Sequence, residues 1–488
     1  MFIRSRDLGY QSRYDERARR RWVRNRDGPI YVMQRRALTM PADDPRIAPS
    51  AAGIRAETEL LILLARTRVL PETTRRIAAL LDQELDWVLF TRDALSHHVL
   101  PLVYTNLKAT GDRAVPAAIL DRLARYFDQH AQHTRRLAAE LLRLLALLDA
   151  HSIPALSVRG PEFAAATYGD GTLRTFGDLD ILIRRRDALR ARDILFGDGY
   201  RLYETPLDAD GFPEESGKYE YMFLREGGDW FTELHWRLTP QHLLSVLDFE
   251  QLGGRRSMVT LDGTPVPTLT AEDTLVALCI HGDHHHWGRL KWVCDIAALV
   301  SATPHMNWRQ AERNARRLGC WRMVALGLRL ASDLLDAPLP EGVSSVVRRD
   351  RRVARLTAAV QDRLLRGSSA ERFADLFDSL GAYRDSRIAA LGALGLMPSD
   401  LSGSADGEPT PPYHPFQLLE RCRDWVWNGV RFARLLLTVN PNDRALLPPL
   451  PWPLHAAYYP VRCVRLLVKY GLPALARHLR IPIRPRSS

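Results

Sequence analysis

The segment DLDILI at residues 178–183 places two acidic residues in what otherwise reads as a buried β-strand. Side chains alternate between the two faces of a strand, so Asp178 and Asp180 share one face. The other face carries the apolar residues Leu179, Ile181 and Ile183. Two carboxylates that close repel each other unless a cation or a shared proton relieves the repulsion. The segment therefore predicts either a metal site on a strand or an exposed turn, because Gly177-Asp178 is also favourable turn chemistry.

The spacing of apolar residues divides the chain into helical parts and one mixed part. Helical spacing precedes and follows a region of short β-like runs, which ends in a hairpin with Asp262-Gly263 at its turn. We therefore expect an α+β fold, with a small mixed-sheet core flanked by N-terminal and C-terminal helical regions. The expected parts are a basic, disordered tail (1–54), an N-terminal helical region (55–150), an α/β core (151–268), a helical region covering the site (269–398), a linker (399–415) and a C-terminal helical region (416–488).

The composition is typical of a folded protein with several domains. A chain of 488 residues, 46% hydrophobic and 26% charged, holds about two to three domains. No segment reaches about 18 uninterrupted apolar residues, and no apolar run follows the N-terminal arginines as it would in a secretory signal. Five scattered cysteines without a CxxC pair indicate reduced thiols in a cytoplasmic protein.

The net charge of +11 is concentrated in the N-terminal tail. Residues 1–39 contain eleven arginines and four acidic residues, a surplus of +7 (11 − 4), which leaves +4 for the rest of the chain. One interpretation is a disordered arm that binds an anionic partner such as RNA. The favoured alternative is sequence upstream of the true start, because Met33 and Met40 both precede the first convincing helix.

Three pieces of the α/β core can converge on one site. Arg159 and Gly160 follow a short strand and precede a helix, where backbone N–H groups and the helix dipole favour a phosphate. Glycine permits close backbone approach, and arginine offers a planar fork of donors. The pair Asp178 and Asp180 is the second piece, and Glu233 in FTELHW is the third. Three carboxylates facing a phosphate suit two Mg²⁺ ions, which prefer oxygen ligands.

The chain resembles the family of uncharacterised bacterial nucleotidyltransferases within the DNA polymerase β-like superfamily. The resemblance lies in the ordered motifs SVRG, LRTFGDLDILIRRRD, TELHWRL and LTAEDTLVALCIHGDHHHWGRLKWVCDIAALV, and it spans about residues 55–305. It implies that Asp178, Asp180 and Glu233 are catalytic metal ligands and that Gly160 belongs to the turn that holds the triphosphate. The implied cofactor is Mg²⁺, with Mn²⁺ as an alternative, and the implied nucleotide is an NTP such as ATP.

Two residues depart from the family pattern at this turn. Arg159 stands where the family usually has lysine, which keeps the charge but changes the geometry of the contact. Pro161 follows the glycine, whereas superfamily members often have a serine whose hydroxyl faces phosphate. These departures motivate an alternative in which the chain binds a nucleotide but catalyses weakly.

Several further side chains are expected to contact the nucleotide. His235 shares the Glu233 face of its strand, and a downstream helix pair is expected to close over the site. The expected nucleotide-binding residues are Arg159, Gly160, Arg174, Gly177, His235, His281, Lys291 and Asp295. An equally weighted alternative is a buried structural hydrogen bond between His281 and Asp295.

Other histidines and tryptophans give weaker signals. His281, His284 and His285 have the spacing of one helix face, but a zinc site is disfavoured because a fourth ligand and an HExxH pattern are lacking. The pair His97-His98 is interpreted as a helix-packing feature. The aromatic residues Trp425 and Trp427 are assigned to packing ahead of base stacking.

The leading hypothesis is a Mg²⁺-dependent transfer of a nucleoside monophosphate from an NTP to an acceptor hydroxyl, with release of pyrophosphate. The acceptor is a small molecule, a peptide or a glycan precursor, in peptide modification or polysaccharide synthesis. One alternative is a nucleotide-binding scaffold of a biosynthetic assembly. The other is a toxin-like transferase acting on RNA or protein, although nucleic acid is the less favoured partner.

Overall fold

A computed structural model describes residues 54–366, with short gaps, and a few positions near residue 420. The gaps are 112–113, 204–206, 209, 214–218, 226–229, 241–242 and 244, and the later positions are 418, 420, 421, 423, 426 and 427. The chain divides into two compact units, 1–418 and 419–488. The expected tail up to residue 53, the linker and nearly all of the C-terminal helical region lie outside the described residues.

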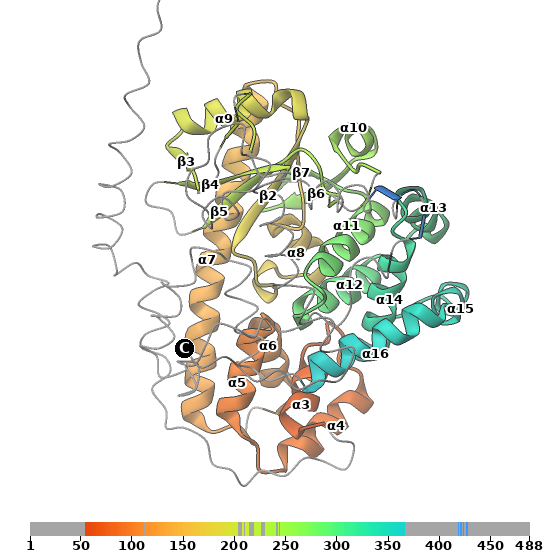
Figure 1. The fold of residues 1–488 in the computed structure, drawn as a ribbon. Coiled ribbons are helices and arrows are strands. Elements are labelled where there is room, and N and C mark those ends of the chain that lie inside the picture. The colour runs from red at the N-terminus through yellow and green to blue at the C-terminus, as the bar shows by residue number, and fades with distance from the viewer. Residues whose placement is uncertain are drawn as a thin grey trace, which may run out of the picture. The chain divides into compact units, whose positions relative to one another are not determined.

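The first described part is helical, as its apolar spacing predicts. Its helices are α3 (Ala56–Leu64), α4 (Pro71–Leu81), α5 (Trp87–Ser96), α6 (Leu100–Gly111) and α7 (Ala117–Ala150). Pro71 opens α4 at a position where its missing N–H costs no hydrogen bond. Asp86 caps α5 by accepting a hydrogen bond from the Leu89 N–H. The long helix α7 leaves this group and continues past the sheet (Figure 1).

A mixed sheet of seven strands follows, in the order β3-β4-β5-β2-β1-β7-β6. Its strands are β1 (Ala155–Ser157), β2 (Asp178–Ile183), β3 (Tyr200–Leu202), β4 (Glu220–Arg225), β5 (Phe231–His235), β6 (Ser257–Leu261) and β7 (Thr264–Thr268). β2 lies between antiparallel β1 and parallel β5, so it is a central strand. The expected hairpin is confirmed as β6 and β7, with Asp262 and Gly263 at positive φ.

Helices connect the strands. They are α8 (Pro161–Tyr168) after β1, α9 (Ala188–Gly197) after β2 and α10 (Phe249–Leu252) before β6, with 3₁₀ turns at Gly171–Leu173, Arg185–Asp187 and Gly253–Arg255. Helices then resume with α11 (Ala271–His284), α12 (Leu290–Ala302), α13 (Trp308–Leu318), α14 (Trp321–Leu335), α15 (Glu341–Arg349) and α16 (Arg351–Arg366). The described residues therefore form a mixed sheet flanked by helical regions, which confirms the predicted fold class (Figure 1).

The apolar face of the central strand lies in the core. Leu179, Ile181 and Ile183 expose at most 1% of their surface and belong to one cluster with the apolar stripe of α7. That stripe consists of Leu137, Leu141, Leu144 and Leu148, spaced by three and four residues. Because every second residue of β2 is fixed in this way, the intervening aspartates must point to the opposite face.

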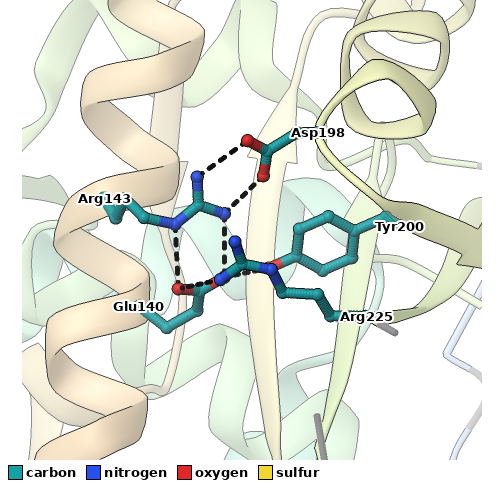
Figure 2. Close-up of polar contacts among 5 residues, drawn as sticks. All are labelled: Glu140, Arg143, Asp198, Tyr200 and Arg225. Carbon is teal, nitrogen blue, oxygen red and sulfur yellow. Dashed lines mark hydrogen bonds and ion pairs between the residues drawn. The ribbon is translucent and has the colours of Figure 1, made fainter. Parts of the chain in front are cut away.

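Polar contacts also tie α7 to the far edge of the sheet (Figure 2). Glu140 accepts hydrogen bonds from Arg143, Arg225 and Tyr200. Arg143 also binds Asp198, with Nη2 2.5 Å from Oδ2. Glu140 is 6% exposed, so its charge is buried together with its partners.

The described residues also bear on the expectations for the cysteines, for membrane-spanning helices and for two tryptophans. The described cysteines Cys279, Cys294 and Cys320 are buried free thiols, and the other two lie outside the described residues. Among the described helices, none has the length and apolar character needed to cross a bilayer. Trp427 is 41% exposed, and Trp425 lies outside the described residues, so their assignment to packing stays a prediction.

Candidate active site

β2 and β5 bring the predicted carboxylates together. The two strands are parallel, and Asp180 pairs in register with Glu233. Side chains at registered positions of paired strands point to the same face, so both carboxylates lie on the polar side of the sheet. Asp178 is the first residue of β2 and is exposed, whereas Asp180 is half-buried. The strand interpretation of DLDILI is therefore confirmed, with Asp178 at its start.

His235 completes a compact cluster with these carboxylates. It lies two residues after Glu233 on the same face, and its Nε2 is 2.8 Å from Asp180 Oδ1 and 3.3 Å from Glu233 Oε2. In the described part of the chain, Asp180, Glu233 and His235 form the group whose ligand atoms lie close enough together, within 4.8 Å, to hold one metal ion. The donor set of two carboxylates and an imidazole fits a divalent cation.

Arg159 is the second cationic partner of Asp180. Its Nη2 lies 3.1 Å from Asp180 Oδ2, and its side chain is 11% exposed. Its φ is 61°, a left-handed conformation that is uncommon for a residue with a side chain and costs about 1–3 kcal/mol. The surrounding structure thus holds this arginine in an unfavourable backbone conformation beside the carboxylates.

The charges of this cluster perturb one another. Burial alone would raise the pKa of Asp180, but Arg159 and His235 hold that pKa well below its usual range. Burial raises the pKa of Glu233 to about 7, opposed by a hydrogen bond from His235 and assisted by the charge of Asp180. Desolvation of its carboxyl group and the charge of Asp180 likewise raise the pKa of Asp178, although the residue keeps access to solvent. The site therefore concentrates negative charge that requires cations for its neutralisation.

The predicted phosphate turn contains an internal carboxylate. Gly160 precedes α8, and its N–H donates to Glu162 Oε1 at 3.2 Å. Ser157 Oγ donates to Glu162 Oε2 at 2.6 Å, and Glu162 is fully buried. A Cβ at position 160 would lie 2.8 Å from Glu162 Oε2, so a larger residue there would displace this buried, hydrogen-bonded carboxylate. The contact of Gly160 with a nucleotide stays a prediction.

The space around Gly177 differs from the space around Gly160. A Cβ at position 177 would meet no heavy atom within 4 Å, although the residue directly precedes Asp178. Packing within the protein therefore gives no reason for glycine at this position. Open space beside a candidate metal ligand is what close approach of a ligand would require.

Arg174 and Asp295 form a buried ion pair next to Arg159. Arg174 donates from Nε and Nη2 to the two oxygens of Asp295, at 2.7 and 2.9 Å, and from Nη1 to the Arg159 carbonyl at 2.7 Å. Tyr168 donates to the same Asp295 carboxylate. Arg174 is 5% exposed and Asp295 1%. The partners of Asp295 are thus Arg174 and Tyr168 rather than His281, and the cluster fixes the backbone of Arg159.

The end of α11 and the start of α12 contribute aromatic and basic residues. His281 and His285 pack edge to face with ring centroids 4.6 Å apart, and His285 stacks on Trp292 at 4.8 Å. Burial lowers the pKa of His281 well below its usual value, and the positive charge of Arg159 adds to this effect. Burial and the charge of Arg174 lower the pKa of Lys291 to about 8, opposed by Asp295 and Asp178. His281, His284 and His285 form no metal-binding group among the described residues.

The start of α12 is held by the N-terminal helices. His97 Nδ1 accepts a hydrogen bond from the Leu290 N–H at 3.1 Å, and the His97 carbonyl accepts from the Lys291 N–H at 3.2 Å. His97 is 2% exposed. The expectation of a packing role for this residue is confirmed, and the packing reaches a residue expected at the nucleotide site.

Sequence reasoning missed three residues of this region: Glu162, Tyr168 and Glu220. An acidic residue in the first turn of a helix is a recognisable signal in a sequence, so the role of Glu162 at the start of α8 could have been predicted. The pairings of Tyr168 with Asp295 and of Glu220 with His235 depend on the tertiary fold.

Comparisons with solved structures give weak similarities to nucleotidyltransferases. The solution structure of the antibiotic-resistance factor ANT(2'')-Ia is 18% identical, covers 36% of this chain and 90% of that chain, and has a TM-score of 0.27. The crystal structure of an antigenic nucleotidyltransferase-like protein from Paracoccidioides brasiliensis is 15% identical, covers 44% and 96%, and has a TM-score of 0.25. No curated protein sequence matches the chain.

The comparison with protein families is more informative. The pattern described as uncharacterised nucleotidyltransferase matches residues 83–336, which is more than half of the 488 residues. The matched segment contains β2, β5, Arg159 and the pair α11 and α12, so it includes every part of the site described above. The chain accordingly belongs to the uncharacterised nucleotidyltransferase family and is a transferase enzyme.

Proposed function

We propose that the enzyme transfers a nucleoside monophosphate from an NTP, with ATP as the first candidate, to an acceptor hydroxyl and releases pyrophosphate. The observation that carries this proposal is the register of β2 and β5, which sets Asp180 against Glu233 with Asp178 at the start of the same strand. Nucleotidyl transfer depends mostly on positioning and on neutralising phosphate charge, which a carboxylate-bound metal site supplies.

Asp178, Asp180 and Glu233 would hold the divalent cations, for which Mg²⁺ is the first candidate. Bound there, the cations would neutralise the phosphates and stabilise the attacking and leaving oxygens. A carboxylate oxygen of Glu233 would accept the proton of the acceptor hydroxyl. The fit is supported by the clustering of ligand atoms around Asp180.

Arg159 and Lys291 are the proposed phosphate ligands of the chain itself. Arg159 already lies 3.1 Å from Asp180, so a cation bound to Asp180 would release its guanidinium toward an incoming triphosphate. Gly160, Gly177 and His281 are proposed to contact the nucleotide. Arg174 and Asp295 are proposed to act through the Arg159 backbone that Arg174 holds.

A nucleotide-binding scaffold is the second candidate function. Two contacts favour this function. Asp180 is already paired with Arg159, and the Gly160 N–H already donates a hydrogen bond to Glu162. If these contacts persist with a nucleotide present, the chain would bind NTP and metal without turnover. The hypothesis of a toxin-like transferase depends on the basic tail, which lies outside the described residues. That hypothesis requires that deletion of residues 1–39 abolish a salt-dependent affinity for RNA.

Incubation with Mg²⁺ and each NTP labelled on the α-phosphate, in a lysate of the native host, tests the proposal. The wild type should label an acceptor and release pyrophosphate, whereas Asp178→Asn and Asp180→Asn should lose at least about a hundredfold in rate, because each removes a metal ligand. Asp193→Asn, an exposed carboxylate on α9, is the matched control and should keep full activity. NTP binding without any labelled acceptor would favour the scaffold instead.

A further inference from the structure

His235 contacts both carboxylates that face each other across β2 and β5. Its side chain is 7% exposed, and its Nε2 points at Asp180 Oδ1 and Glu233 Oε2 together, at 2.8 and 3.3 Å. These three residues, rather than the three carboxylates, form the closest group of ligand atoms among the described residues. The nitrogen therefore stands where a cation held by Asp180 and Glu233 would meet it.

Glu220 fixes which nitrogen of His235 faces the site. Strands β4 and β5 are antiparallel, and Glu220 pairs in register with His235. Glu220 Oε2 lies 3.2 Å from His235 Nδ1, so Nδ1 donates its hydrogen away from the site. Metal-binding histidines almost always donate their second ring N–H to a carboxylate or carbonyl in this way.

With the hydrogen on Nδ1, the lone pair of Nε2 and the carboxylate oxygens of Asp180 and Glu233 all point toward one small region. Distances of 2.8 and 3.3 Å from Nε2 to these oxygens place three ligand atoms around that region. A single cation could be shared by all three atoms.

We propose that His235 Nε2 directly coordinates the cation shared by Asp180 and Glu233, with Glu220 as its orienting residue, so that this position selects Mn²⁺-like cations over Mg²⁺. Imidazole nitrogen suits borderline transition metals, whereas Mg²⁺ prefers oxygen ligands and octahedral geometry. Asp178 and Asp180 together offer oxygens alone and remain suited to Mg²⁺. The inference rests on the proposed function, which it refines by assigning the two cation positions different chemistry.

Mn²⁺ alone is the probe, because its unpaired electrons report coordinated nitrogen. Pulsed electron paramagnetic resonance of the full-length protein with Mn²⁺ should show ¹⁴N coupling from a directly bound imidazole. His235→Gln should lose this coupling and bind Mn²⁺ at least about 10–100-fold more weakly, because a direct ligand contributes no less than an outer-shell partner. Glu220→Gln should weaken Mn²⁺ binding within the same range of about 10–100-fold while keeping the coupling.

Two further variants separate coordination from general damage. His235→Asp restores an anionic oxygen ligand, so it should bind Mn²⁺ without ¹⁴N coupling and should reduce the preference for Mn²⁺ over Mg²⁺ by about tenfold. His284→Gln is the matched control: it changes an exposed histidine near Glu220 and should alter neither the coupling nor the affinity.

The outcomes distinguish this inference from the proposed function. Mn²⁺ bound to the wild type without ¹⁴N coupling, while nucleotidyl transfer persists, would overturn the role of His235 and leave the function in place. Coupling that survives in His235→Gln would also overturn it, because another histidine would then be the ligand. A wild type that binds neither Mn²⁺ nor Mg²⁺ would overturn both.

Discussion

At the residue scale, the site converges on Asp180. This carboxylate pairs in register with Glu233, accepts a hydrogen bond from His235 and forms an ion pair with Arg159. Each of its partners is either a cation or a second ligand for a cation. The residue therefore links metal binding to the release of the arginine that we propose for the phosphates.

Replacing Arg159 separates these two roles. Arg159→Met removes the cation that competes for Asp180, so Mn²⁺ should bind at least about tenfold more tightly, because hydrogen bonds to charged groups contribute about 1.5–3 kcal/mol. NTP affinity should fall in the same variant, because a phosphate ligand is lost. Metal and nucleotide titrations by calorimetry measure both effects. Arg159→Lys, which keeps the charge, is the control, and a parallel loss of both affinities in Arg159→Met would contradict the account.

The two glycines of the site should respond differently to alanine. Gly160→Ala forces a Cβ to within 2.8 Å of Glu162, so it should lower the free energy of unfolding by about 1–3 kcal/mol. Gly177→Ala meets no atom within 4 Å and should leave stability unchanged while weakening NTP binding. Chemical denaturation and nucleotide titration compare the pair. Unchanged NTP binding in Gly177→Ala would remove Gly177 from the site.

At the element scale, His97 connects the N-terminal helices to α12. His97→Ala removes the acceptor for the Leu290 N–H, which should lower the free energy of unfolding by about 1–2 kcal/mol and weaken NTP binding through Lys291. His97→Asn places an acceptor at a similar position and should restore most of both. Loss of stability without any change in NTP affinity would show that this contact is structural alone.

The buried network of α7 should make stability depend on pH. Burial alone would raise the pKa of Glu140, but hydrogen bonds from Arg143 and Tyr200 hold that pKa below its usual value. A carboxyl whose folded pKa is depressed contributes stability above its unfolded pKa of about 4.3 and loses it as the pH falls through the folded pKa.

Glu140→Gln should therefore destabilise the protein by about 1–3 kcal/mol near neutral pH, and the difference from wild type should shrink below about pH 4. Denaturant unfolding at several pH values measures it. The exposed Glu84→Gln is the control and should show no such dependence. A constant difference across the pH range would contradict a charged Glu140 in the folded protein.

At the scale of the whole molecule, the local spacing of apolar residues predicted the strand β2 and which of its side chains share a face. The alternation of β2 fixed Asp178 and Asp180 on one face, and the core around Leu179 confirms it. The ion pair of Arg174 with Asp295 spans 121 positions, and His235 reaches Asp180 across 55, so no local pattern contains them. The sequence identified the carboxylates but not the residues that orient their neighbours.

The active site depends on parts of the chain that are far apart in the sequence. Helix α12 carries Lys291, whose charge interacts with Asp178, is anchored to the N-terminal helices by His97 and holds Arg174 through Asp295. Assembly of the site therefore requires the N-terminal helical group and the sheet together. The family pattern, residues 83–336, covers the helices from α5 onward together with the sheet and α12.

The most direct measurement follows the position of a label in the NTP. With host lysate as the source of acceptor, wild-type protein and divalent cation should transfer label from the α-phosphate, while label on the γ-phosphate should appear in pyrophosphate. Asp180→Asn should abolish both signals. Transfer of the γ-label to an acceptor, or α-label transfer that persists in Asp180→Asn, would contradict nucleotidyl transfer at this site.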